Sequence, residues 1–169
     1  MVKPSDVIVI GTLAAAGITA AAIDLRTRRV PNALTLPLAA AGLAVAAAGI
    51  GRVSLAGSLA GLAIGVVLML PGHLFGATGA GDVKLFGASG ALLGPAAIVA
   101  AFIYTAIAGG LLAIVVALGR GRLQRTLGSA AGLVTGAAKA ADIEAAAENN
   151  RFPYAPAIAV GAIVAAIGL

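Results

Sequence analysis

Residues 85–119 read LFGASGALLGPAAIVAAFIYTAIAGGLLAIVVALG, a run of 35 residues that carries no charge. As one straight α-helix this run would be about 52 Å long, whereas the hydrocarbon core of a bilayer is about 30 Å thick. Gly94 and Pro95 lie near its middle, and such a dipeptide marks a turn. The sequence therefore predicts a hairpin of two helices, over 83–94 and 96–118, of which the first is short.

The composition of the whole chain agrees with a membrane protein. Of its 169 residues, 61% are hydrophobic and only 10% are charged, whereas soluble domains are about 45–50% apolar and about 25% charged. Four more apolar stretches predict further spans over 6–24, 33–50, 54–74 and 154–169. We expect an all-α, polytopic membrane protein with about six transmembrane helices, which form a single domain over 1–169.

The basic residues predict the orientation of these spans. With the hairpin in place, nine of the eleven Lys and Arg residues face one side and two, Lys3 and Arg52, face the other; without it, the split is four to seven. The positive-inside rule therefore favours six spans with the N-terminus outside. The nine are Arg26, Arg28, Arg29, Lys84, Arg120, Arg122, Arg125, Lys139 and Arg151. The net charge of +5 thus reports membrane orientation, and no nucleic-acid partner is expected.

The residues that are missing exclude several kinds of chemistry. The chain has no cysteine and a single histidine, which excludes disulfides, thiol catalysis and His/Cys metal clusters. We therefore expect no metal and no cofactor. The first apolar segment ends in Asp24 rather than in a cleavage pattern, so we expect a retained helix and no signal peptide. The loop over 119–153 is expected in the cytoplasm, and no chemistry is assigned to it.

Glycines recur every fourth residue in the third predicted span, at Gly57, Gly61 and Gly65. Small residues at this spacing let two helices pack closely in lipid. We expect this face to support close helix packing, including self-association with a second copy of the chain.

Two of the six acidic residues adjoin apolar spans on the same predicted side of the membrane. Asp24 ends the first span and Asp82 precedes the fourth. Carboxylates inside a membrane are costly and are therefore candidates for function. Two carboxyl groups held together share a proton, so that one activates water while the other polarises a carbonyl group. The structural alternatives are a helical ion pair of Asp24 with Arg28 and N-terminal capping of a helix by Asp82.

The residues around Asp82 form a distinctive segment, Gly79-Ala80-Gly81-Asp82-Val83-Lys84. The two glycines allow another stretch of chain to approach closely beside the acid, such as an extended segment that is to be cut. Lys84 either lowers the pKa of a nearby carboxyl group or only helps to set the orientation. Pro31 and Asn32 predict the end of one helix and the N-cap of the next.

This segment resembles the G-x-G-D motif of the type IV prepilin peptidases, which are membrane aspartyl proteases. Residues 24–32, DLRTRRVPN, resemble the other aspartate motif of that family, and residues 152–159, FPYAPAIA, are similar to the start of its final helix. The resemblance implies that Asp24 and Asp82 are the catalytic dyad, with Gly79, Gly81 and Lys84 as supporting residues of the motif. It also implies cleavage of the leader peptide of prepilin-like precursors at the cytoplasmic face of a bacterial or archaeal cell membrane.

The short turn between the two first helices distinguishes this chain from the larger members of that family. Those members carry a cytoplasmic insert there, often with paired cysteines, and also methylate the cleaved pilin. Only the segment from Asp24 to Asn32 occupies this place here. The chain therefore resembles the compact, peptidase-only branch, such as the enzymes that serve Flp/Tad pili.

Two rival functions stay open at this point. Gly87-Ala88-Ser89-Gly90 resembles the serine motif of rhomboid proteases, although the single histidine, His73, precedes the serine instead of following it. The chain could also be a non-catalytic membrane subunit of a secretion or pilus assembly. Changing each aspartate to asparagine separates the three classes.

Overall fold

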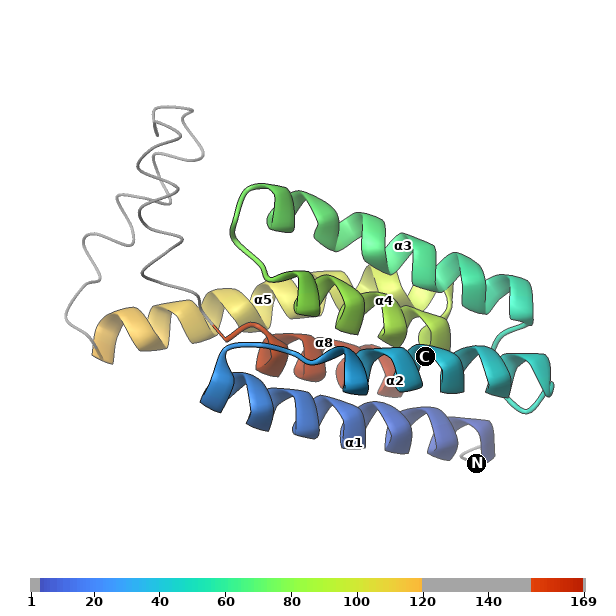
Figure 1. Cartoon of the computed structure of the whole chain (residues 1–169). Coiled ribbons are helices and arrows are strands. Elements are labelled where there is room, and N and C mark those ends of the chain that lie inside the picture. The colour runs from blue at the N-terminus through green and yellow to red at the C-terminus, as the bar shows by residue number, and fades with distance from the viewer. Residues whose placement is uncertain (1–3, 120–152, 169) are drawn as a thin grey trace.

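The computed structural model describes residues 4–119 and 153–168, and these residues form six helices and no strand. The helices are α1 (Pro4–Thr27), α2 (Asn32–Ala47), α3 (Leu55–Leu74), α4 (Ala80–Leu93), α5 (Pro95–Gly119) and α8 (Ala155–Ile167). They lie side by side as one bundle (Figure 1). The predicted all-α class is confirmed. The predicted loop over 119–153 lies outside the described residues, apart from its two end positions.

The predicted hairpin within 85–119 is confirmed. Helix α4 ends at Leu93 and α5 begins at Pro95, so Gly94 alone connects them. Gly94 has a φ of +79°, a conformation that glycine adopts without steric cost. Proline suits the first position of a helix because its φ is already helical and it has no N–H to leave unpaired. The two residues therefore turn the chain back on itself within one position.

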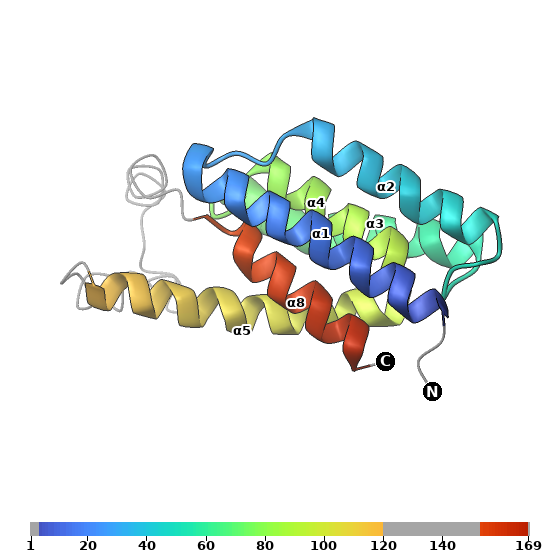
Figure 2. The same ribbon diagram turned by 90° about the horizontal axis from the view of Figure 1, so that it is seen from below.

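Helix α4 lies at the centre of the bundle (Figures 1 and 2). It packs against α2 and α3 and also contacts α8 and α5. From Asp82 to Leu93 its residues are buried with the exception of Lys84. A helix that is apolar on nearly every side is typical of such a central position.

Three helices are long and apolar enough to cross a membrane. They are α1, α3 and the stretch of α5 over 95–116, whereas α2 and α8 are shorter apolar helices. Helix α5 has 25 residues and α4 has 14. At the end of the bundle where α4 begins, α5 extends past the ends of the other helices (Figures 1 and 2).

Two glycines bring α3 and α4 into backbone contact. A Cβ atom added to Gly61 would collide with the carbonyl oxygen of Gly90, and one added to Gly90 would collide with that of Gly61. Ser58 adds a hydrogen bond across the same interface, because its hydroxyl donates to the carbonyl oxygen of Ala91 at 2.6 Å. Gly61 and Gly65 are buried and face α4 within the chain. Self-association through the series that begins at Gly57 stays a prediction.

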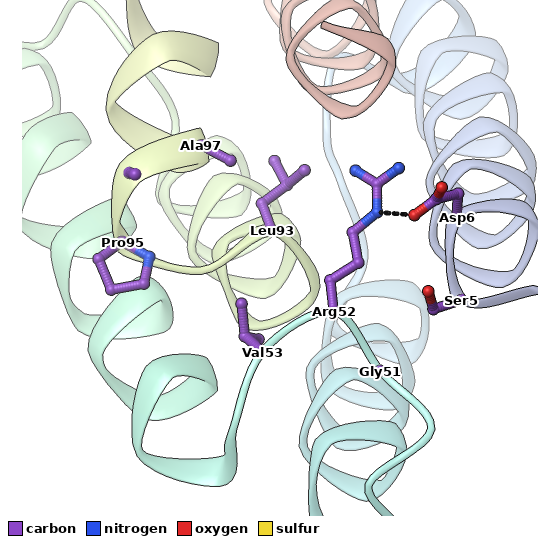
Figure 3. Close-up of a pocket in the computed structure, with 9 residues that line it drawn as sticks. Ser5, Asp6, Gly51, Arg52, Val53, Leu93, Pro95 and Ala97 are labelled. Carbon is purple, nitrogen blue, oxygen red and sulfur yellow. Dashed lines mark hydrogen bonds and ion pairs between the residues drawn. The ribbon is translucent and has the colours of Figure 1, made fainter. Parts of the chain in front are cut away.

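The two ends of the bundle carry different polar groups. At one end, which we call the arginine end, Arg52 Nε donates to Asp6 Oδ1 at 2.8 Å, and its Nη1 donates to the carbonyl oxygen of Ala166 at 2.7 Å. Arg52 thus ties the first turn of α1 to the last turn of α8. A pocket of about 490 Å³ lies beside this ion pair (Figure 3) and is bounded in part by Leu93 and Pro95. The opposite end holds Asp24 and Asp82, and we call it the aspartate end.

Candidate active site

Asp24 lies in the last turn of α1, and only 4% of it is exposed. Its Oδ2 accepts a hydrogen bond from the backbone N–H of Ala155 at 3.1 Å, and the N–H of Tyr154 also interacts with the carboxylate. The first N–H groups of a helix have no acceptor within that helix. The start of α8 therefore supplies the donors that hold Asp24.

The alternative of an ion pair between Asp24 and Arg28 is wrong in the described part of the chain. The backbone of Arg28 has a φ of +53°, and its N–H donates to the carbonyl oxygen of Asp24 at 2.8 Å. The N–H of Arg28 still closes the last helical turn, but its left-handed backbone ends α1, and among the described residues its side chain forms no ion pair with Asp24. The carboxylate bonds with the start of α8 instead.

Asp82 lies in the first turn of α4, with 7% of it exposed. Its Oδ2 accepts from the N–H of Gly79 at 2.9 Å. The N-cap residue of α4 is Gly79 and Asp82 is the third residue of the helix, so Asp82 pairs with the N-cap backbone and is not the N-cap itself. Oδ1 is buried and has no hydrogen-bond partner among the described residues. Buried polar atoms are rarely left unpaired, which makes Oδ1 the atom available to a shared proton, a water molecule or a substrate.

The two aspartates come together at the aspartate end of the bundle. They are close enough for the negative charge of Asp24 to act on Asp82, and the charge of Asp82 acts on Tyr154 in turn. Among residues 4–119 and 153–168, no group of three or more His, Cys, Asp or Glu could hold a metal ion. The chemistry that this arrangement supports is proton transfer between two carboxyl groups.

Gly81 brings the turn between α1 and α2 onto the start of α4. A Cβ atom added to Gly81 would lie 2.7 Å from the carbonyl oxygen and 3.0 Å from the Cβ atom of Val30. Val30 itself is buried. The close approach expected from the glycine is thus present, and the segment that approaches is the chain's own turn.

Lys84 and Asn32 form a second contact between the two aspartate motifs. Lys84 Nζ donates to Asn32 Oδ1 at 2.9 Å. The prediction of Asn32 as the N-cap of the second helix is wrong, because Pro31 holds that position and no side chain caps the helix. The side chain of Asn32 accepts the hydrogen bond from Lys84 instead.

The serine and histidine of the rhomboid alternative lie apart. Ser89 is buried within α4, and its hydroxyl donates to the carbonyl oxygen of Leu85 at 3.0 Å. His73 is exposed near the end of α3, where Nδ1 donates to the carbonyl oxygen of Thr78 at 3.1 Å. Neither side chain hydrogen-bonds the other in the described residues, so the pair lacks the contact that a serine nucleophile needs with its base.

A comparison with known protein families identifies the family of the chain. The model of the type IV leader peptidase family matches residues 11–114, which are more than half of the chain and include both aspartate segments. The chain belongs to the type IV leader peptidase family. No curated protein matches the chain, and no solved structure matches it.

Membership of the type IV leader peptidase family makes the chain a peptidase, and its long apolar helices agree with a location in a membrane. The matched region runs from the first half of α1 into α5. Helix α8 lies beyond it, although the amide of Ala155 contacts Asp24. The structure therefore places a third segment, the start of α8, at the site beside the two aspartate segments that the family model covers.

Three contacts of the site do not follow from the sequence pattern. They are the Ala155 amide on Asp24, the packing of Val30 on Gly81, and the hydrogen bond from Lys84 to Asn32. The sequence signal for the first was the resemblance at 152–159, which assigned no role to a backbone amide. Val30 carried no signal beyond its apolar side chain.

Proposed function

We propose that this member of the type IV leader peptidase family is an aspartic endopeptidase in which Asp24 and Asp82 form the catalytic dyad. The observation that carries the proposal is that two buried carboxyl groups from separate helices lie at one end of the bundle, close enough for their charges to interact, with Asp82 Oδ1 unpaired among the described residues. Burial of two acids together is costly unless they share a proton. An aspartic peptidase requires such a pair.

In the proposed reaction, the ionised carboxylate removes a proton from a water molecule as its oxygen attacks the carbonyl carbon of the scissile peptide bond. The protonated carboxyl group donates its proton to the carbonyl oxygen, so a neutral tetrahedral intermediate forms. The C–N bond then breaks as the amine takes up a proton from the first aspartic acid and the second recovers one from the intermediate. Both aspartates end in their starting states.

The proposed substrate is a prepilin-like precursor, cut between its basic leader and its apolar segment at the cytoplasmic face of the cell membrane. Three arginines at the aspartate end, Arg26, Arg28 and Arg29, support this face because basic residues are retained in the cytoplasm. The connection from α1 to α2 is only a short turn, which supports a peptidase without methyl transfer.

The test is to follow processing of a co-expressed small pilin-like precursor by the intact, membrane-inserted protein. Asp24→Asn and Asp82→Asn each preserve size but remove the charge and the shared proton, so each should abolish processing while membrane insertion persists. The double variant should be no worse than either single variant, because groups that act as one unit lose function non-additively. Near-normal processing by either single variant would show that the aspartyl mechanism is wrong.

Sequencing the N-terminus of the processed precursor tests the substrate proposal separately. We expect the mature protein to begin at or just before its apolar segment, which it retains. A new N-terminus beyond that segment would instead indicate an activity like that of a signal peptidase.

A further inference from the structure

The two aspartate segments are joined by a contact that involves neither aspartate. Lys84 follows Asp82 by two positions and Asn32 follows Asp24 by eight, and Lys84 Nζ donates to Asn32 Oδ1 at 2.9 Å. The contact therefore links α4, just after its first turn, directly to the first residue of α2.

Helix geometry directs Lys84 away from the dyad. Residues two apart on a helix do not face each other, and the structure follows this rule, because Asp82 is buried whereas Lys84 is exposed. A role for Lys84 as a cation placed against the carboxyl groups is therefore disfavoured. Within residues 4–119 and 153–168, the hydrogen bond of its ammonium group goes to Asn32.

Asn32 is free to accept this bond because it does not cap its own helix. Asparagine at a helix start usually accepts from the helix's own backbone N–H groups. Here Pro31 is the N-cap residue, and α2 has no side-chain cap. The side chain of Asn32 therefore accepts from a lysine 52 positions away and not from its own helix. Its hydrogen bond stabilises a contact between distant segments of the chain.

The turn between α1 and α2, which leads into Asn32, has a strained backbone at Arg28 and packs against α4 at Val30. Arg28 leaves α1 with a φ of +53°, a conformation that costs free energy in a residue other than glycine. Val30 is buried against the backbone of Gly81. Helix α1 itself packs mainly on α8, so the turn is a principal link between the segment of Asp24 and the helix of Asp82.

We propose that Lys84 and Asn32 are positioning residues that hold this turn on the start of α4 and so fix Asp24 relative to Asp82. The inference rests on the proposed function of the two aspartates. It assigns the lysine of the motif a mechanical role through Asn32, in place of an electrostatic role on the carboxyl groups.

The experiment measures kcat and KM for leader removal. The enzyme is purified and placed in vesicles of phosphatidylethanolamine and phosphatidylglycerol, and the same pilin-like precursor, purified in its unprocessed form, is added as substrate. Asn32→Ala and Lys84→Met should each lower kcat by about tenfold, the loss expected for one hydrogen bond to a charged group, with KM unchanged. The double variant should lose no more than either single variant. Asn32→Asp keeps an acceptor for Lys84 and should restore most of the wild-type kcat.

The pH dependence of kcat distinguishes the mechanical role from an electrostatic one. Positioning predicts that Asn32→Ala and Lys84→Met keep the wild-type pH profile. Arg29→Met is the matched control, because it removes an exposed cation of the same turn whose side chain makes no hydrogen bond or ion pair in the described residues, and it should keep the wild-type kcat.

Two results would overturn the inference. One is a wild-type kcat for Asn32→Ala, and the other is a shifted pH profile in Lys84→Met that Asn32→Ala lacks. Either result leaves the proposed function standing as long as Asp24→Asn and Asp82→Asn are inactive. Activity in those aspartate variants would refute the proposed function itself.

Discussion

The carboxylate of Asp24 accepts a hydrogen bond from the backbone amide of Ala155, 131 residues further along the chain. This bond joins the end of α1 to the start of α8. At the other end of the same two helices, Arg52 connects Asp6 with the carbonyl oxygen of Ala166. The first and last helices are therefore tied at both ends, and this leaves Asp24 little freedom to move relative to α8.

Ser89→Ala and His73→Ala should each retain substantial processing activity. Ser89 donates only to the carbonyl oxygen of Leu85 in its own helix, and that acceptor is already used by the helix backbone. The measurement is the rate of precursor processing with the wild-type protein alongside. A loss of 100-fold or more in either variant, with normal insertion, would revive the serine-protease alternative.

Gly81→Ala should disrupt the site although it adds a single methyl group. That methyl group would meet the backbone of Val30, which cannot rotate away as a flexible side chain could. Overpacking of this kind costs about 1–3 kcal/mol, and the turn must shift away from Asp82. We expect processing to fall at least tenfold at a temperature where the variant remains folded.

Gly110→Ala is the matched control for Gly81→Ala, because nothing lies within 4 Å of a Cβ atom added there. Its processing rate should equal that of the wild type. If the two variants behave alike, the packing of Val30 on Gly81 has no role in the reaction.

The orientation of the chain can be tested with single cysteines, since the natural sequence has none. Ile50 is 55% exposed in the connection from α2 to α3, at the arginine end. Ile50→Cys should react with an impermeant thiol reagent added to intact cells. Ala77 is exposed at the aspartate end, so Ala77→Cys should react only after the cells are permeabilised. The reverse pattern would place the aspartates on the outer face.

The helices and the meeting of Asp24 with Asp82 could be predicted from the sequence because their signals are local. Each span is a strongly apolar run, and the turn between α4 and α5 follows from two adjacent residues, Gly94 and Pro95. Once the spans alternate across a membrane, the two acids must lie at the same end. Each helix bound differs from the predicted one by three residues or fewer.

The connections within the site could not be predicted because they join residues far apart in the chain. The local pattern of Pro31 and Asn32 indicates an N-cap, and only the packed structure reveals that Lys84 competes for the same side chain. Likewise, the spacing of Asp24 and Arg28 is typical of a helical ion pair. The helix ends before Arg28, and the carboxylate finds a donor on α8.

The unequal lengths of α4 and α5 determine how deep in the bilayer the dyad sits. Gly94 places the end of α4 and the start of α5 at one level, yet α4 has 14 residues and α5 has 25, or about 21 Å and about 37 Å. A hydrocarbon core is about 30 Å thick, so the start of α4 falls well short of the far boundary that α5 reaches. If Asp82 acts as proposed, we expect water and a peptide bond to reach it from below the boundary that α5 reaches, through the space above the start of α4.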